Sequence, residues 1–292
     1  MTKITVGGVP EHFNLPWHLA IEDGAFETKG INLQWETIAG GTGAMTKGLR
    51  AGELDLAVVL TEGICADIIK GNPSKLIQQY VRSPLIWGIH AGANSKYNNC
   101  SEIEKARFAI SRNGSGSHIM AYVFAEQQGW EPTDLSFEIV GNFDGAREAF
   151  KNDTADILLW EKFTTKPFVD SGELKRIGHT ITPWSCFMIA ATDDVLKNKR
   201  DAVENTLKVI RKYCDDFMNR NDAVDLVAER YDLLKKDANA WYRQTGWSTN
   251  NYVSKKMLQD VIRTLADVEV IEKQVAVEPL CDEMLWFDLL VE

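Results

Sequence analysis

The length, composition and charge of the chain exclude several classes of protein. With 292 residues, of which 45% are hydrophobic and 25% charged, it has the composition of a globular chain of two domains or lobes. A net charge of −10 argues against nucleic acid or an anionic membrane as the main partner. No apolar run approaches the ~20 residues of a membrane-spanning helix, so no direct membrane insertion is expected.

The cysteines and the first residues bear on metal binding and location. The five cysteines are widely scattered and form no CxxC pair, so we expect no zinc or other metal site, and no motif indicates a cofactor. The segment MTKITVGGVP leads into a strand without a basic stretch and an apolar core, so no secretory signal is expected. We therefore predict a cytoplasmic location; a periplasmic or other extracytoplasmic one is the alternative if a signal was removed.

Strands and helices alternate from the N-terminus, which is typical of an α/β fold with largely parallel sheets. The first part of the chain predicts strands at Ile4–Gly8, Leu33–Ile38, Leu54–Leu60, Leu76–Val81 and Leu85–His90, and helices at Trp17–Glu27, Ala44–Ala51 and Ile64–Lys70. The segment Ile31–Gly63 organises this part. Its strands are expected to end in the loops Ala39–Gly43 and Thr61–Gly63 at one edge of a sheet, where ligands bind.

The second part of the chain repeats this layout and then becomes helical. Predicted strands are Arg107–Ile110, Leu135–Val140, Ile157–Trp160, Leu174–Ile177 and Phe187–Ala191, with helices at His118–Gln128, Gly145–Lys151, Ala202–Arg220, Ala223–Leu234, Asp237–Thr245 and Lys255–Leu265. Two extended crossings, near 83–87 and 184–187, predict a hinge. Lobe one is then 1–83 plus 185–292, with the helical tail, and lobe two is 87–184.

Several segments in a fixed order resemble a known family. They are LAIEDGAFETKGINLQW, LRAGELDLAVV, KARFAISRNGSGSH, EQQGWEPTDLSFEIV and FKNDTADILLWEKF, spread over about Lys3–Lys212. The chain resembles the substrate-binding proteins of nitrate, sulfonate and taurine importers, a superfamily that includes thiamin-precursor binding proteins and the fungal pyrimidine synthase. The resemblance implies a two-lobed type II periplasmic-binding fold that closes on a small molecule, and it leaves the ligand open.

The resemblance to the pyrimidine synthase does not extend to its chemistry. Alignment on Leu54–Gly63 puts the lysine of that enzyme near Val59 and its histidine near Gly63, and its cysteine cluster falls on Trp184–Met188, where Cys186 alone is present. Valine cannot form a Schiff base and glycine carries no ring, so synthase activity is not expected.

Two glycine-containing loops are the first binding candidates. In Ser111–His118 (SRNGSGSH), successive backbone N–H groups before a helix can bind an anion; the alternative is a glycine turn with a serine N-cap. The loop Gly40–Thr42 allows the same two interpretations. Three carboxylates on strand ends would suit an amine or ring N–H donor, although each could instead cap a helix or pair with a base.

Aromatic side chains near these loops could sandwich a heterocycle, although core packing explains any single one of them. Trp160–Glu161 matches the W-E pair that the family has at a ligand-facing strand end, whereas the helical Trp241, Tyr242, Trp247 and Trp286 are expected to be packing residues. No catalytic residue is predicted. The predicted ligand-binding set is Glu11, His12, Phe13, Gly40, Gly41, Thr42, Thr61, Glu62, Arg82, Arg112, Gly114, Ser115, Gly116, Ser117, His118, Trp160, Glu161 and Trp184.

Three functions remain open from the sequence. We favour a binding module that holds a compact anion or a planar nitrogen heterocycle in an interlobe cleft without chemistry of its own. The alternatives are a cytosolic enzyme of thiamin-precursor or menaquinone-type metabolism on the same fold, and a ligand sensor for a protein partner. The expected partner is a small molecule, with a membrane permease only if the protein is exported; the sequence does not set the oligomeric state.

Overall fold

The computed structural model describes residues 1–288, without the side chain of Pro132. The chain divides into two compact units. Unit 1 comprises Met1–Ser83, Trp184–Ala266 and the segment that begins at Ile271, and unit 2 comprises Pro84–Pro183 and Asp267–Val270. The last four residues of the predicted lobe one, 289–292, lie outside the described residues. The assignment of Asp267–Val270 to unit 2 had no counterpart in the sequence analysis.

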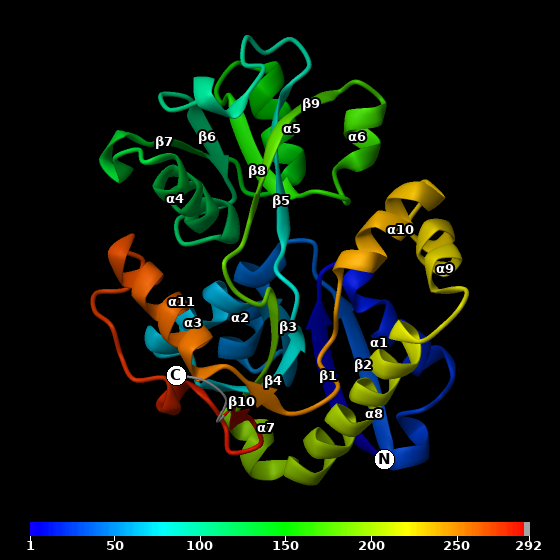
Figure 1. Cartoon of the computed structure of the whole chain (residues 1–292). Helices are drawn as coiled ribbons and strands as arrows, with labels where there is room; N and C mark the ends of the chain where they lie inside the picture. The colour runs from blue at the N-terminus through cyan, green and yellow to red at the C-terminus, as the bar shows by residue number, and fades with distance from the viewer. Residues whose placement is uncertain (289–292) are drawn as a thin grey trace. The chain divides into compact units, whose positions relative to one another are not determined.

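Unit 1 is built on a five-stranded sheet with the order β2-β1-β3-β10-β4 (Figure 1). Its strands are β1 (Thr2–Gly8), β2 (Ile31–Thr37), β3 (Leu56–Leu60), β4 (Ser74–Val81) and β10 (Phe187–Thr192). β1 is parallel to β2 and β3, whereas β10 is antiparallel to β3 and β4. The sequence LAVVL of β3 is almost continuously buried, as expected for a strand covered on both faces.

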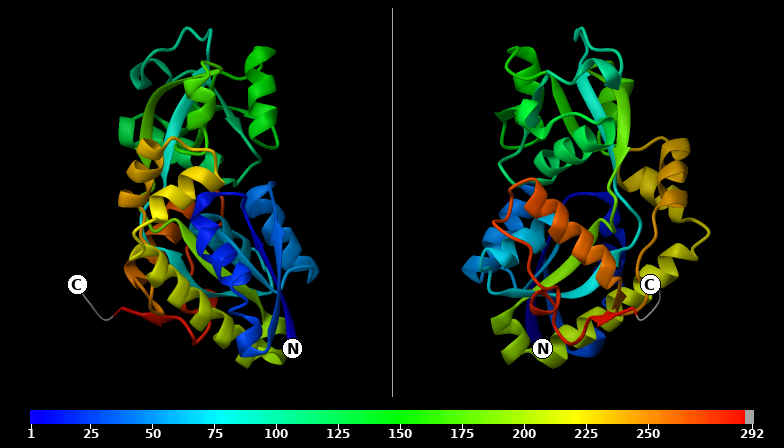
Figure 2. Two further views of the ribbon diagram at one scale, coloured as in Figure 1. Left: turned by 90° about the vertical axis from the view of Figure 1, so that its right-hand side faces the viewer. Right: turned by 60° about the vertical axis from the view of Figure 1, so that its left-hand side comes forward.

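The helices of unit 1 cover both faces of this sheet. They are α1 (Leu15–Glu22), α2 (Gly41–Ala51), α3 (Thr61–Ile69), α7 (Asp193–Asn198), α8 (Arg200–Met218), α9 (Ala223–Arg230), α10 (Lys235–Gln244) and α11 (Lys255–Asp267). The steps from β1 to β2 and from β2 to β3 run in opposite directions across the sheet, so right-handed crossovers place α1 and α2 on opposite faces. The long helix α8 packs along α1 (Figures 1 and 2).

Small elements complete unit 1. Short 3₁₀ helices occur at His12–Asn14, Glu27–Lys29 and Glu278–Leu280, and β11 (Tyr252–Val253) pairs with β12 (Trp286–Phe287). The predicted helix Trp17–Glu27 ends at Glu22, because the chain turns through Gly24 with φ of +65° and continues into the second 3₁₀ helix.

Unit 2 has a sheet of the same size, with the order β7-β6-β8-β5-β9 (Figure 1). Its elements are β5 (Ile86–Gly92), β6 (Arg107–Ile110), β7 (Ser136–Ile139), β8 (Ile157–Glu161), β9 (Leu174–Ile181), α4 (Gly116–Gln128), α5 (Phe143–Lys151) and α6 (Lys166–Asp170), with 3₁₀ helices at Cys100–Glu102 and Pro132–Asp134. β6, β7 and β8 are parallel, and β5 is antiparallel to β8 and β9. The predicted α/β class with mostly parallel sheets is therefore confirmed.

Two predicted boundaries in the segment Ile31–Gly63 are wrong, and both matter for the site. Helix α2 begins at Gly41 rather than Ala44, so the glycine loop supplies the first helical turn. Thr61–Gly63 is not a loop, because α3 begins at Thr61 directly after the extended Leu60. Among the described residues, no helix is long and apolar enough to cross a membrane.

Candidate ligand-binding site

One edge of the unit 1 sheet collects the carboxyl ends of four parallel strands, β1, β2, β3 and β4. The register of β1 with its two neighbours places Gly8, Thr37 and Leu60 toward this edge. β10 runs the other way, with Phe187 opposite Leu60, so the residues just before Phe187 reach the same edge. Ligands of α/β proteins bind outside the carboxyl ends of the strands, which makes this edge the first candidate site.

Glu62 is a buried carboxylate at this edge, in the first turn of α3, with only 1% of its surface exposed. Its Oε2 accepts a hydrogen bond of 2.9 Å from Nε1 of Trp184. Its Oε1 is buried and has no hydrogen-bond partner among residues 1–288, and no described lysine or arginine forms an ion pair with it. The positive end of the α3 dipole favours an ionised carboxylate here, but it does not supply the missing donor.

Burial controls the protonation of Glu62. It raises the pKa of the carboxyl to about 7, while the nearby backbone N–H of Glu62 and the hydrogen bond from Trp184 oppose the shift. A buried oxygen without a donor costs about 1–3 kcal/mol. Among the predicted site residues, Glu62 is therefore the one for which a missing hydrogen-bond donor within the described chain is best defined.

Thr42, Thr61 and Gly63 shape the backbone around Glu62. The hydroxyl of Thr42 accepts a 3.0 Å hydrogen bond from Leu60 N, and the hydroxyl of Thr61 donates one of 2.5 Å to Ser185 O. A Cβ at Gly63 would lie 2.6 Å from Cγ2 of Thr42, so glycine is needed for α3 to approach α2 so closely. The predicted residues Thr42 and Thr61 therefore join the start of α2, the end of β3 and the chain before β10.

The glycine loop Gly40–Thr42 is compact. Gly40 is exposed, and a Cβ there would lie 2.8 Å from Cβ of Ala44. Gly41 has φ of +64°, a left-handed conformation that favours glycine. The glycines therefore allow α2 to start immediately at the sheet edge.

Aromatic rings from the loop after β1 pack with the segment that contains α9 and α10. The ring of His12 stacks on Trp241 with centroids 4.3 Å apart, and Phe13 lies 5.3 Å from Trp241 and 5.2 Å from Phe187. Nε1 of Trp241 and the hydroxyl of Tyr231 are buried without a hydrogen-bond partner in the part of the chain that the structure describes. Burial lowers the pKa of His12 to about 3, so its ring is neutral at pH 7.

Two other predicted residues of unit 1 are more accessible. Glu11 is half-buried and precedes this aromatic group. Arg82 is exposed, and its backbone N–H donates a 2.8 Å hydrogen bond to Gly246 O. The structure thus brings Phe13, Glu62 and Trp184 to one edge through contacts inside unit 1. Arg82 reaches the same edge, because β4 ends with Val81 opposite Phe187.

In unit 2, the loop Ser111–His118 follows β6 and its polar groups bond to one another. The hydroxyl of Ser117 accepts a 3.1 Å hydrogen bond from Ser111 N and lies 3.0 Å from the hydroxyl of Ser115. Ser115 is the N-cap of α4, with its hydroxyl 3.4 Å from His118 N. Nδ1 of His118 accepts a 3.0 Å bond from Gly114 N, and burial lowers the pKa of His118 to about 4.

The other predicted members of this loop complete the turn. Arg112 is half-buried, Gly114 has φ of +72°, and Gly116 is the first residue of α4. The hydrogen bonds within Ser111–His118 are those of a glycine turn with a serine N-cap, which was the alternative to an anion-binding loop.

Glu161 ends β8 and is also buried, but its surroundings differ from those of Glu62. Its Oε2 accepts backbone hydrogen bonds of 2.8 Å from Phe163 N and 2.5 Å from Thr164 N. Burial raises the pKa of Glu161, and these backbone donors oppose the shift. The neighbouring Trp160 is half-buried, with its ring 5.7 Å from that of Phe143. Glu161 therefore closes a turn within unit 2.

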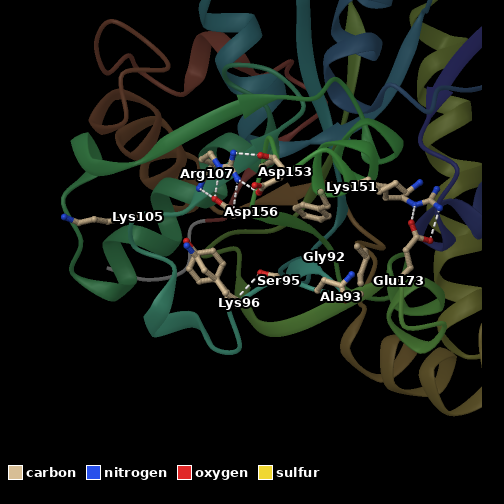
Figure 3. Close-up of a pocket in the computed structure, with 16 residues that line it drawn as sticks. Gly92, Ala93, Ser95, Lys96, Lys105, Arg107, Lys151, Asp153, Asp156 and Glu173 are labelled. Atoms are coloured by element: carbon tan, nitrogen blue, oxygen red, sulfur yellow. Dashed lines mark hydrogen bonds and ion pairs between the residues drawn. The ribbon is translucent and has the colours of Figure 1, made fainter.

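A large cavity of about 910 Å³ lies elsewhere in unit 2 (Figure 3). Its lining includes Gly92 and Leu174, which pair where β5 ends and β9 begins, and Arg107, where β6 begins. It therefore lies at the sheet edge opposite to Ser115 and Glu161, away from the carboxyl ends of β6 and β8.

The charges of this cavity are largely matched by carboxylates. Arg107 bonds to Asp153 and Asp156, as Figure 3 shows, with Nη2–Oδ1 and Nε–Oδ2 distances of 2.7 and 2.9 Å. Arg147 bonds to Glu173 through two nitrogens at 2.5 and 2.9 Å. Because these guanidinium groups already have carboxylate partners, we consider the unit 1 edge the better candidate despite the larger volume here.

Sequence reasoning missed Tyr231, which was not singled out. Trp241 was expected to be a packing residue, and its buried ring does pack on His12 and Phe13. Their distance of more than 200 residues from the loop after β1 gives no sequence signal for the contact with His12. No group of three or more His, Cys, Asp or Glu residues that could hold a metal ion occurs in the described part of the chain.

The two α/β units have the sheet architecture of the periplasmic-binding-protein fold. The model of the family described as Ca3427-like PBP matches residues 87–180. A comparison with curated protein sequences found no match. Together with the structural similarities that follow, this places the chain in the type II periplasmic-binding-protein fold superfamily.

Solved structures show the same fold over nearly the whole chain. The Candida albicans CA3427 gene product, described as defining a new family with the generic periplasmic binding protein fold, is 25% identical, with a TM-score of 0.88 and 98% of each chain covered. The alkanesulfonate-binding protein SsuA from Xanthomonas axonopodis pv. citri is 13% identical, with a TM-score of 0.80 and 99% of each chain covered. The nitrate-binding protein NrtA from Synechocystis is 12% identical, with a TM-score of 0.72, and covers 93% of this chain and 82% of its own.

Proposed function

We propose that this protein binds a small polar molecule, a compact anion or a planar nitrogen heterocycle, without chemistry of its own. The binding site of this proposal is the carboxyl edge of the unit 1 sheet, with Glu62 and Trp184 as the central polar residues. The buried Oε1 of Glu62, which has no hydrogen-bond partner among residues 1–288, carries the proposal. The fold supports it, because SsuA and NrtA, which share it, are described as binding proteins for small polar solutes.

Two parts of the sequence analysis stay predictions. One is the joint contribution of residues from both units, such as Ser115, Ser117 and Glu161 beside Gly40–Thr42 and Glu62. The other is the cytoplasmic location, which fractionation of native cells would test. A copy found secreted or in a periplasm would contradict it and favour a role beside a membrane permease.

Native mass spectrometry of the full chain is the direct test. We expect a copurified small molecule that is released on unfolding and that raises the melting temperature when it is added back. Binding to the folded state alone stabilises it by about 2.7 kcal/mol at a ligand concentration of 100 Kd. Conversion of that molecule into a product would instead favour an enzyme, and a chain that carries and rebinds nothing would contradict the proposal.

A further inference from the structure

The buried carboxylate of Glu62 constrains the chemistry of the ligand. At pH 8, above the pKa of about 7, the carboxyl of Glu62 is mostly ionised, and an ionised carboxylate accepts hydrogen bonds and donates none. One oxygen of Glu62 accepts from Trp184, and the other is buried with no donor among residues 1–288. An oxyanion brought against that oxygen would add like charge in a buried place, whereas an N–H group would supply the missing donor.

We infer that the unit 1 edge recognises a nitrogen compound through an N–H donor aimed at Oε1 of Glu62, and that it rejects compact oxyanions. This inference rests on the proposed function and narrows its ligand class. It separates this chain from the alkanesulfonate-binding and nitrate-binding proteins that share its fold.

The surroundings of Glu62 agree with a flat, partly apolar nitrogen compound. Trp184, which donates to the carboxylate, is 3% exposed, and Phe187 three residues later is buried against Phe13. From Phe13 the ring contacts continue to Trp241, whose buried Nε1 is a donor without a described acceptor. Aromatic rings therefore gather at this edge together with the carboxylate, which suits a flat nitrogen compound that packs on rings and donates an N–H.

Glu161 and the charged residues of the large cavity in unit 2 do not indicate a ligand in the same way, because their charged groups already have partners. The turn after β8 already supplies two backbone donors to Glu161. Arg107 and Arg147 in the cavity are held by carboxylates. Glu62 differs from Glu161, Arg107 and Arg147 because one of its oxygens has no donor in the described chain.

The test compares matched probes on the full chain at pH 8, by thermal melting and calorimetry. The N–H probes are 2-aminopyrimidine, cytosine and benzamidine, and the oxyanion probes are methanesulfonate, nitrate and methylphosphonate. We expect at least one N–H probe and no oxyanion to raise the melting temperature. Glu62→Gln, which keeps an acceptor for Trp184 but loses the charge, should weaken N–H probe binding by about 10-fold or more. The exposed Glu53→Gln removes the same charge elsewhere in unit 1 and should bind like the parent.

The outcomes separate the ligand class from the function itself. Binding of an oxyanion by the parent, or equal binding of the N–H probe by the parent and Glu62→Gln, would overturn the inference while the proposed binding function stands. If no probe of either class binds and no small molecule copurifies, both the inference and the proposed function fail.

Discussion

Trp184 donates its indole N–H to Oε2 of Glu62 over 2.9 Å, and both side chains are almost fully buried. Because burial raises the pKa of Glu62 to about 7, the folded protein binds a proton here that the unfolded chain, with an ordinary glutamate pKa near 4.5, has released. The contribution of the group to stability is therefore complete below about pH 4.5 and is lost as the pH rises toward 7. We expect the unliganded protein to lose about 3 kcal/mol of unfolding free energy from this group over that interval.

Glu62→Gln isolates this contribution. The variant should lack the decrease, so the difference in unfolding free energy between parent and variant should change by about 3 kcal/mol between pH 4.5 and pH 7 in urea titrations. The buried rings of His12, His90 and His118 have lowered pKa values, so they also destabilise the fold as the pH falls. Their contribution is the same in parent and variant, so it cancels in the difference between the two unfolding free energies. A difference that stays constant across this range would show that Glu62 keeps an ordinary pKa.

Trp184→Phe tests how the hydrogen bond from Trp184 affects the pKa of Glu62. Removal of the indole donor leaves the carboxylate without its side-chain hydrogen bond, so we expect the pKa of Glu62 to rise further. Infrared titration of the buried carboxyl, with Glu62→Gln as the blank, measures the shift. A lower pKa in the variant would mean that water reaches the carboxyl once the indole is gone.

Gly63 and Thr42 are predicted to be coupled. Because a Cβ at position 63 would lie 2.6 Å from Cγ2 of Thr42, Gly63→Ala should displace the start of α2 and cost about 1–3 kcal/mol. Thr42→Ser removes that methyl group and keeps the hydroxyl that accepts from Leu60 N. The double variant should therefore recover most of the loss in chemical denaturation, and purely additive effects would show that the steric explanation is wrong.

The comparison of Glu62 and Glu161 shows where sequence reasoning stopped. The alternation of strands and helices, with LAVVL as a buried strand, predicts the α/β fold correctly because hydrophobic periodicity is a local property. The sequence analysis placed both carboxylates at strand ends, and the family resemblance favoured Glu161 through its W-E pair. Whether a carboxylate already has a donor depends on distant groups, such as Trp184 for Glu62, and on the exact turn that follows the strand.

The boundary errors have a similar cause. Glycines at 40, 41 and 43 are typical of a loop, yet α2 starts at Gly41, and the hydroxyl of Thr42 in its first turn accepts from Leu60 N at the end of β3. Likewise, Thr61 begins α3 without a loop, with its hydroxyl bonded to Ser185 O. These partners lie 18 and 124 residues apart in sequence, so no local pattern could reveal them.

Ser117 and Ser115 should differ in their effects on stability. Ser117→Ala removes the acceptor of Ser111 N and a contact of the Ser115 hydroxyl, and we expect a loss of about 1–2 kcal/mol in unfolding free energy. Ser115→Ala removes a cap whose bond to His118 N is longer, at 3.4 Å, and should cost less. If both variants keep parental stability but no longer bind the copurified molecule, the hydroxyls face the ligand instead, as the sequence-based prediction has it.

Glu161→Ala is the decisive variant for unit 2. It removes the oxygen that accepts from Phe163 N and Thr164 N, so both backbone donors lose their partner at the turn after β8. We expect the unfolding free energy to fall by about 1–3 kcal/mol, the usual cost of leaving such groups unpaired. Glu161→Gln keeps an acceptor oxygen and should recover part of this loss. Thermal melting measures the stability, and calorimetry with the copurified molecule measures binding at a temperature where each variant remains folded. A variant that melts like the parent but binds at least tenfold more weakly would assign Glu161 to the ligand and show that the turn holds without it.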